Sequence, residues 1–321
     1  MEGAGKTLVE VAREFKVKEL LPADFELVRI DSNANVVEAL KILKEKNIHS
    51  APIFDEAKKE YLGLIDMVDL TTTVAIFSES HGIAEALAGR GIGWDEWIQH
   101  EKEVVNDIKV TEVAGFGERS PWSPVYCDFP LHSLLDMFSK QVNLHRVPVV
   151  TGEGAVVGLV SQWRVIQFLH EQVLPALPRL AEKKVGDCIG KECGNHKVFS
   201  INQNELVLEA WKSILENNIL GLAVVDDHGV LVGSISVSDI KRSSSADSMW
   251  ADVRLPIAEF LRKDFFSAPR NLVTCTKEDT LSTVFQRLVA NHVHRIFVVD
   301  GTGKAQNVLS LCDVISALQQ E

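Results

Sequence analysis

One pattern of apolar and polar positions recurs four times along the chain. In each copy, apolar residues three and four positions apart predict an amphipathic helix, and a run rich in Val and Ile predicts a strand after it. A turn, a second strand and a polar residue that opens another helix follow. The helix segments read NVVEALKILKEK, PLHSLLDMFSKQ, ELVLEAWKSILEN and DTLSTVFQRLVAN, and the lead-ins before the copies read KVKELL, KVTEVA, KVGDCI and PIAEFL. Each copy is therefore predicted to be a βαββα repeat.

The repeats predict an α/β fold of the α+β kind that uses nearly the whole chain. We place repeat 1 at residues 8–80, repeat 2 at 104–175, repeat 3 at 180–245 and repeat 4 at 253–321, with an elaborated connection at 81–103. One repeat with two or three strands buries too little apolar surface to be stable alone. We therefore expect repeats 1+2 and repeats 3+4 to pair into two pseudo-symmetric modules.

Two segments interrupt the repeat pattern and leave alternatives open. Region 76–124 contains Trp94, Trp97 and Trp122, which either pack the insertion onto its own domain or anchor a partner. Residues 241–248, with the sequence KRSSSADS, are typical of a solvated linker, and phosphorylation of the serines is the alternative.

Composition excludes several function classes. The chain has 321 residues, of which 46% are hydrophobic, and a net charge of -12 with a pI near 5.4. It therefore offers no basic surface for tracking a nucleic-acid backbone. No apolar run approaches the ~20 residues that a membrane helix needs, and the first residues lack a signal-peptide core. We expect a protein without nucleic-acid or membrane partners, in the cytoplasm, the nucleus or both.

The cysteines and motifs indicate neither a metal site nor a catalytic centre. Five cysteines scattered through apolar patterns predict reduced thiols rather than a disulfide framework. Cys188, Cys193 and His196 are close in sequence, but their spacing is not that of a zinc knuckle and no fourth ligand is nearby. The motif sets of hydrolases, metalloproteases and kinases are missing from the sequence, and the four repeats use essentially all residues. The chain is predicted not to be an enzyme.

The position that opens the second helix of each repeat is the first candidate for ligand binding. It holds Asp69, Arg164, Asp239 and Asp313. A helix N-terminus presents N–H groups and partial positive charge, which favour an anionic group, and a carboxylate there can accept a hydrogen bond from a diol such as ribose. Asp is also a preferred helix cap, so both roles stay open for the three acids. Arg164 cannot hold a ribose in the same way.

Small polar residues precede that position and complete a polar patch. They are Ser161 in repeat 2, Ser236 and Ser238 in repeat 3 and Ser310 in repeat 4, whereas repeat 1 has Asp66. Because a carboxylate repels phosphate, repeat 1 is expected to be the weakest of the acid-bearing sites.

A second column of candidates lies just before the middle strand of each repeat. It reads His49-Ser50, His145-Arg146, Leu220-Gly221 and His294-Arg295. Arg offers a planar fork for phosphate oxygens, and His adds a donor that strengthens on protonation. The two His-Arg pairs therefore predict a phosphate-binding centre. Surface or inter-repeat salt bridges are the alternative.

At these residues the chain resembles proteins built from cystathionine-β-synthase (CBS) domains. More narrowly, it resembles the gamma regulatory subunits of AMP-activated and sucrose-non-fermenting-type protein kinases. The narrower resemblance depends on four copies in one chain, on the Asp-Arg-Asp-Asp column, and on the segments HRVPVV, VHRIFVVD and LSLCDVISAL.

The resemblance implies a non-catalytic, energy-sensing subunit that binds AMP, ADP or ATP between repeats and needs no other cofactor. It directs Asp69, Asp239 and Asp313 towards the ribose, and His145, Arg146, His294 and Arg295 towards the phosphates. It also implies a complex with a kinase catalytic (alpha) subunit and a scaffold (beta) subunit. The alternative is a stand-alone CBS protein or adaptor that regulates another enzyme or a transporter, with an adenosyl ligand or none.

The chain departs from the family pattern at four places. His49-Ser50 and Leu220-Gly221 lack basic or polar groups that the family often shows, Asp66 stands where a hydroxyl is usual, and Trp163 stands where a Lys is expected. These departures imply fewer nucleotide sites or weaker exchange among nucleotides.

Overall fold

The computed structural model describes residues 6–22, 25–80, 107–115, 121–141, 144–189, 197–243, 246–263 and 272–319. The predicted connection at 81–103, with Trp94 and Trp97, lies outside these residues, as do Cys193, His196 and the serines at 244–245. The chain divides into two compact units. Unit 1 comprises Met1–Leu27, Trp122–Phe199 and Arg270–Glu321, and unit 2 comprises Val28–Pro121 and Ser200–Pro269.

Each repeat contributes one three-stranded sheet in which a short first strand runs parallel to the second and the third runs antiparallel to it. The sheet of repeat 1 contains β1 (Ile30–Asp31), β2 (Ser50–Asp55) and β3 (Glu60–Asp66). That of repeat 2 contains β4 (Val125–Tyr126), β5 (Arg146–Val150) and β6 (Val156–Ser161). Repeat 3 has β7 (Ser200–Asn202), β8 (Gly221–Val225) and β9 (Leu231–Ser236), and repeat 4 has β10 (Thr274–Cys275), β11 (Arg295–Val299) and β12 (Ala305–Ser310).

Two helices complete each repeat. Because parallel strands need a crossover, the first helix connects the first two strands. These crossover helices are α2 (Val36–Glu45), α7 (Leu131–Lys140), α11 (Val207–Glu216) and α14 (Leu281–Ala290). The helices after the third strand are α3 (Met67–Ser80), α8 (Gln162–Phe168), the 3-10 helix η4 (Val237–Arg242) and α15 (Leu311–Leu318). The predicted fold class of four βαββα repeats is confirmed.

Each lead-in packs on the neighbouring repeat in the sequence rather than on the repeat that it precedes. The lead-ins form η1 (Val17–Leu20), α6 (Val110–Val113), α10 (Val185–Cys188) and α13 (Ile257–Leu261). Backbone bridges join Lys16 to Pro130, Lys109 to Asn35, Lys184 to Thr280 and Pro256 to Leu206. Consecutive repeats therefore exchange their lead-ins. The predicted domain ranges keep each lead-in with the repeat that follows it in the sequence, and these ranges stay a prediction.

A strand glycine makes room for one exchanged lead-in. A Cβ atom added at Gly158 of β6 would lie 2.5 Å from Leu21 Cδ2, whereas one at the equivalent Gly233 of β9 would lie 3.5 Å from Leu261 Cδ1. The lead-in of repeat 1 therefore approaches the sheet of repeat 2 more closely than an alanine would permit without movement.

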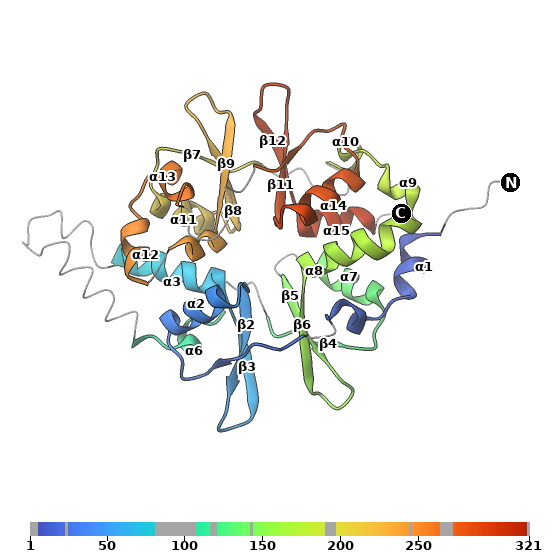
Figure 1. Cartoon of the computed structure of the whole chain (residues 1–321), viewed down its shortest axis with the longest axis horizontal. Helices are drawn as coiled ribbons and strands as arrows, with labels where there is room; N and C mark the ends of the chain where they lie inside the picture. Colours follow the sequence, from blue (N-terminus) through green and yellow to red (C-terminus); the bar gives the residue numbers. More distant parts are fainter. Residues whose placement is uncertain are drawn as a thin grey trace, which may run out of the picture. The chain divides into compact units, whose positions relative to one another are not determined.

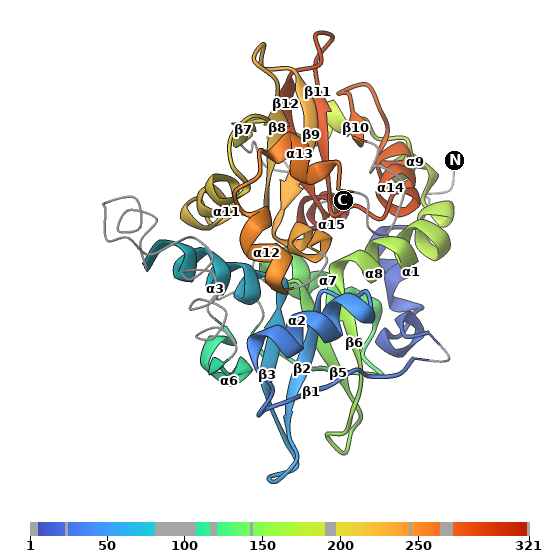
Figure 2. The same cartoon turned by 60° about the vertical axis from the view of Figure 1, so that its left-hand side comes forward.

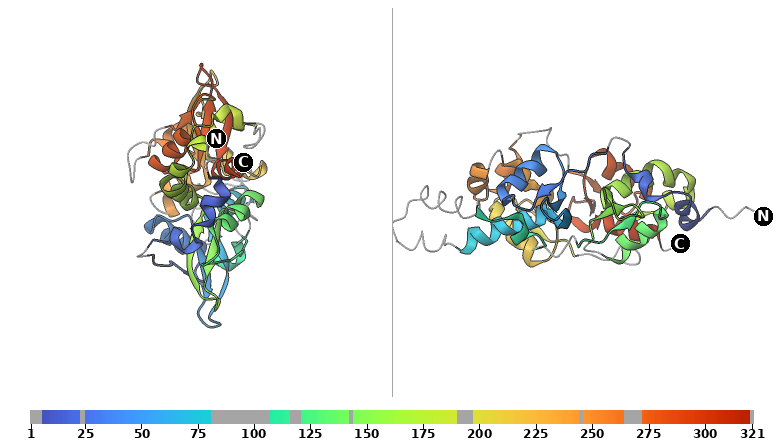
Figure 3. Two further views of the ribbon diagram at one scale, coloured as in Figure 1. Left: turned by 90° about the vertical axis from the view of Figure 1, so that its right-hand side faces the viewer. Right: turned by 90° about the horizontal axis from the view of Figure 1, so that it is seen from below.

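Unit 1 contains repeats 2 and 4 with the lead-ins of repeats 1 and 3. Figure 1 shows the helices of repeats 2 and 4 side by side, in green and red, and Figure 3 shows the same elements from two further directions. Phe138 of α7 and Phe285 of α14 are fully buried in one hydrophobic core. The Cys312 thiol donates to the Phe138 carbonyl (3.3 Å) and the Gln319 amide to an Asp136 carboxylate oxygen (3.3 Å). Remaining elements here are α1 (Leu8–Arg13), η2 (Leu169–Val173), η3 (Leu174–Ala176) and α9 (Pro178–Ala181).

Unit 2 contains repeats 1 and 3 with the lead-ins of repeats 2 and 4. Helix α3 packs against α11 and η4, and Figure 2 shows α12 (Ala246–Asp252) above α2 in the same unit. Trp211 of α11 is fully buried. The Thr71 hydroxyl donates to the Val237 carbonyl (3.1 Å), and the Lys44 ammonium donates to the Ser243 carbonyl. These bonds join repeat 1 to repeat 3.

The compact units thus combine alternate repeats, whereas the predicted modules combine consecutive ones. The apolar faces of the helices explain the combination, because α15 packs on α7 and α8 in unit 1 as α3 packs on α11 and η4 in unit 2. The pairing of repeats 1+2 and 3+4 into modules stays a prediction.

The described cysteines, Cys127, Cys188, Cys275 and Cys312, are free thiols, as the sequence predicted for them. Burial raises the pKa of the Cys275 thiol to about 12. None of the helices in the described ranges is long and apolar enough to cross a membrane.

Candidate functional site

The three candidate acids close the N-terminus of the helix that follows the third strand. A carboxylate oxygen of Asp239 accepts the Ser236 backbone N–H (2.8 Å), and Asp313 accepts that of Ser310 (2.7 Å). In repeat 1, Asp69 accepts the backbone N–H of residue 66 (3.0 Å). The capping role is confirmed for all three. A ribose-binding role for the same carboxylates stays a prediction.

The serine patch is part of the same caps. The Ser310 hydroxyl donates to Asp313 (2.5 Å), the Ser236 hydroxyl donates to Asp239 (2.7 Å), and the Ser161 hydroxyl accepts the Arg164 backbone N–H (3.2 Å). In repeat 1, one Asp66 oxygen accepts the Val68 and Asp69 backbone N–H groups at 2.8 and 3.1 Å. Asp66 thus replaces a serine as a cap and adds a second carboxylate, 4% exposed, beside Asp69, 3% exposed.

Arg164 anchors a lead-in. Its Nε donates to the Leu20 carbonyl (2.6 Å) and its Nη1 to Gln167 Oε1 (2.8 Å). Arg242 makes the related contact in unit 2, where its Nη1 donates to the Leu261 carbonyl (3.4 Å) while its Nε pairs with Asp239 (2.8 Å). The sequence indicated that Arg164 could not act as a ribose acceptor, but it contained no signal for this lead-in contact.

Strand register brings the basic column and the cap column together. Arg146 of β5 lies directly opposite Ser161 of β6, and Arg295 of β11 lies opposite Ser310 of β12. Opposite residues on antiparallel strands have their Cβ atoms about 5 Å apart and share a face of the sheet. The structure therefore assembles an arginine, a histidine before it and a capped helix N-terminus in both repeats of unit 1.

Unit 2 has the same register with different residues. Ser50 of β2 lies opposite Asp66, and Gly221 of β8 lies opposite Ser236. The Ser50 hydroxyl is buried and has no hydrogen-bond partner among the described residues. Both His-Arg pairs thus belong to unit 1. The salt-bridge alternative for these pairs stays open.

Trp163, where the family pattern has Lys, stacks on His292. Their ring centroids are 4.6 Å apart with an interplanar angle of 17°, and both residues belong to unit 1. Trp163 therefore makes an aromatic contact from repeat 2 to repeat 4.

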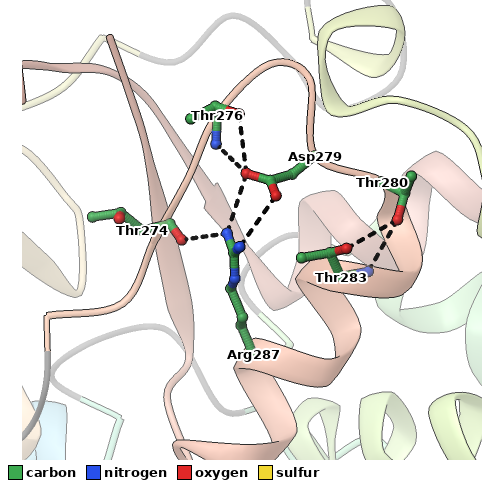
Figure 4. Close-up of polar contacts among 6 residues, drawn as sticks. All are labelled: Thr274, Thr276, Asp279, Thr280, Thr283 and Arg287. Carbon is green, nitrogen blue, oxygen red and sulfur yellow. Dashed lines mark hydrogen bonds and ion pairs between the residues drawn. The ribbon is translucent and has the colours of Figure 1, made fainter. Parts of the chain in front are cut away.

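A further polar network orders the loop between β10 and α14 (Figure 4). Arg287 forms a two-pronged ion pair with Asp279, with both N–O distances at 3.1 Å, and donates to the Thr274 carbonyl (2.8 Å). Partial burial opposes ionisation of Asp279, but hydrogen bonds from Thr276 and Arg287 outweigh it and lower the pKa of the Asp279 carboxyl. The network holds the first strand against the crossover helix, and sequence reasoning missed it.

The described residues contain no group of three or more His, Cys, Asp or Glu side chains fit to hold a metal ion. Cys188 is buried and its thiol donates to the Lys184 carbonyl (3.5 Å).

The sequence profile of the CBS domain matches the chain four times, at residues 17–76, 123–171, 190–246 and 263–320. The chain belongs to the CBS-domain family. The four matches cover more than half of its residues and coincide with the four sheets.

Relatives of this CBS protein include gamma subunits of protein kinases. The 5'-AMP-activated protein kinase subunit gamma of Saccharomyces cerevisiae is 23% identical over 309 residues, covering 92% of this chain and 88% of the relative. The SNF1-related protein kinase regulatory subunit gamma-1-like of Arabidopsis thaliana is 26% identical over 376 residues, covering 92% and 83%. The resemblance inferred from the sequence motifs is confirmed.

A solved structure supports the fold of this CBS protein. A Methanocaldococcus jannaschii protein superposes with a TM-score of 0.70 at 17% identity. The match covers 94% of this chain and 99% of that chain.

Proposed function

We propose that this CBS protein is a non-catalytic regulatory subunit that binds AMP, ADP or ATP and regulates a protein kinase complex. One observation carries the proposal: both repeats of unit 1 place a His-Arg pair opposite a serine-capped helix N-terminus. Arginine and free helix N–H groups are complementary to phosphate.

The ribose would be held by a capping carboxylate, with Asp313 as the candidate in unit 1 and Asp69 and Asp239 in unit 2. Ser161, Ser236 and Ser310 would present the helix N-terminus to the ligand. Arg164 would serve indirectly, because its guanidinium holds Leu20 and Gln167.

The kinase part of the proposal is supported by the relatives, which are named as kinase gamma subunits. We propose a catalytic (alpha) and a scaffold (beta) subunit as partners, in the cytoplasm, the nucleus or both. Regulation would work by linkage: a nucleotide that prefers one arrangement of the repeats shifts the equilibrium of the partner that contacts that arrangement.

The test is titration of the full chain with AMP, ADP and ATP by calorimetry. We expect the double variant Arg146→Ala/Arg295→Ala to bind at least tenfold more weakly, because a charge-assisted hydrogen bond contributes about 1.5–3 kcal/mol. The matched control is Ser50→Ala, which alters the equivalent strand position in unit 2 at a hydroxyl without a partner among the described residues.

A parent chain that binds no adenine nucleotide at millimolar concentration would refute nucleotide sensing. Equal binding by parent and double variant would show that the His-Arg pairs are not the site. Thermal unfolding of each variant checks that the fold is retained. Activity of a co-purified kinase, measured with and without the tightest nucleotide, then tests the regulatory part.

A further inference from the structure

Two positions in unit 1 depart from the repeat pattern, and they contact each other. The position of Trp163, directly before the second-helix column, holds Val68 in repeat 1, Ser238 in repeat 3 and Cys312 in repeat 4. None of these three is aromatic. The repeat pattern therefore does not require an indole at Trp163.

The position of His292 departs in a similar way. It follows the crossover helix in the left-handed region, with a φ of 51°. The equivalent positions of repeats 1 and 3 hold Asn47 (φ 50°) and Asn218 (φ 51°). Asn tolerates this backbone conformation better than most residues. A histidine at this place needs another reason.

The contact between the two rings supplies a reason. The rings are nearly parallel, with an interplanar angle of 17° and centroids 4.6 Å apart. Trp163 is half-buried and His292 is exposed, so the indole covers one face of the imidazole while the ring edge reaches solvent. The Trp163 indole N–H has no hydrogen-bond partner among the described residues. The stack on His292 is the aromatic contact that the structure shows for Trp163.

The stack connects the two phosphate-binding candidates of unit 1. Trp163 lies on the first turn of α8, next to Arg164 and two residues after Ser161. His292 lies on the turn between α14 and β11, three residues before Arg295. Movement of that turn would move the start of β11. The stack therefore fixes the His-Arg segment of repeat 4 against the helix N-terminus of repeat 2.

We propose that Trp163 and His292 are positioning residues that couple anion binding at repeat 2 to anion binding at repeat 4. This inference depends on the proposed nucleotide binding. A phosphate group held at one repeat restricts the turn or the helix end that the stack joins, and the other repeat then binds with less loss of conformational freedom. An aromatic pair of this kind corresponds to about a 2- to 10-fold change in an equilibrium constant.

The test is a double-mutant cycle on the full chain, with AMP affinity measured by calorimetry. Trp163→Val introduces the residue of repeat 1, and His292→Asn introduces the residue of repeats 1 and 3. We expect each single variant to bind AMP about 2- to 10-fold more weakly, and the double variant to be no weaker than the singles. Trp163→Phe preserves a stacking ring and should recover most of the affinity.

A spectroscopic measurement separates positioning from general stability. In the parent, the ring current of Trp163 should shift the His292 imidazole proton resonances, and AMP should change that shift. Additive losses in the cycle, or unchanged AMP affinity in the variants, would overturn the coupling. If the parent binds no AMP, the proposed function itself fails, whereas a binding parent with equally binding variants refutes the positioning role alone.

Discussion

Units 1 and 2 are built from the same elements in the same register, yet the charges at equivalent strand ends differ. At the start of the middle strand, unit 1 has Arg146 and Arg295, whereas unit 2 has Ser50 and Gly221. At the cap position opposite this strand end, repeat 1 of unit 2 has the carboxylate of Asp66, whereas both repeats of unit 1 have a serine. The fold depends on the apolar faces of the helices and strands, so the polar strand ends are free to differ.

In its core, each unit buries a large ring at the same helix position. Trp211 of α11 and Phe285 of α14 are both fully buried. We expect Trp211→Ala and Phe285→Ala each to lower the free energy of unfolding by about 3–5 kcal/mol, because a buried ring is lost and a cavity remains. Hydrogen exchange should rise in unit 2 for the first variant and in unit 1 for the second.

Leu62→Ala is the control for this pair, since Leu62 is 43% exposed and should cost far less. A uniform rise of exchange across both units in either core variant would show one cooperative body. The difference between the units would then be one of surface chemistry alone.

Asp66→Ser should make repeat 1 more like the repeats of unit 1. The serine can still cap α3, as serines do in the other repeats, while one buried negative charge is removed. We expect tighter binding of phosphate-bearing adenine nucleotides by about fivefold, which corresponds to about 1 kcal/mol of relieved repulsion at partly screened distances. Calorimetry with AMP measures the change.

Adenosine is the control ligand. It lacks the phosphate charge, so its affinity should change little in Asp66→Ser. An equal gain for AMP and adenosine would indicate a change in shape rather than in charge.

The smallest expected effect concerns the loop network of repeat 4. The pKa of Asp279 is lower in the folded state than in the unfolded chain. Its ion pair therefore stabilises the fold at pH values above the ordinary Asp pKa of about 3.9. This contribution is lost as the pH falls through the lower pKa of the folded state. Asp279→Asn should therefore cost about 0.5–1 kcal/mol near neutral pH, and the difference from the parent should shrink in acid. Urea unfolding between pH 7 and pH 3 measures it.

Glu205 occupies the equivalent position of repeat 3 in unit 2 and makes no ion pair within the described residues, so Glu205→Gln serves as the control. A pH-independent cost for Asp279→Asn would assign the effect to loop shape rather than to charge.

The sequence predicted the features that depend on local pattern. The apolar periodicity around Leu134, Trp211 and Phe285 was sufficient for the helices. The preference of Asp for helix caps was sufficient to suggest the capping role of Asp313. The structure adds that the two columns meet, because one register repeats in all four sheets. These features need only contacts between residues close in the chain or one hairpin apart.

Contacts between distant segments were not predictable in this way. A lead-in such as KVKELL has an apolar pattern that fits its own repeat and the neighbouring one equally well, so its exchange left no signal. The bond from Arg164 to Leu20 and the stack of Trp163 on His292 join residues more than a hundred positions apart. Sequence reasoning noticed Trp163 only as a departure, because nothing local identified its partner.

The exchanged lead-ins have a consequence for how the protein is made. Lys16 reaches its partner Asp128 across 112 positions of the chain, and Lys184 reaches Glu278 across 94. During synthesis, the first lead-in must therefore wait until the sheet of repeat 2 has emerged, and contacts of such long separation slow folding. A deletion of residues 6–20 should destabilise repeat 2 and leave the sheet of repeat 1 folded. Truncation of one end would therefore unfold a segment in the middle of the chain.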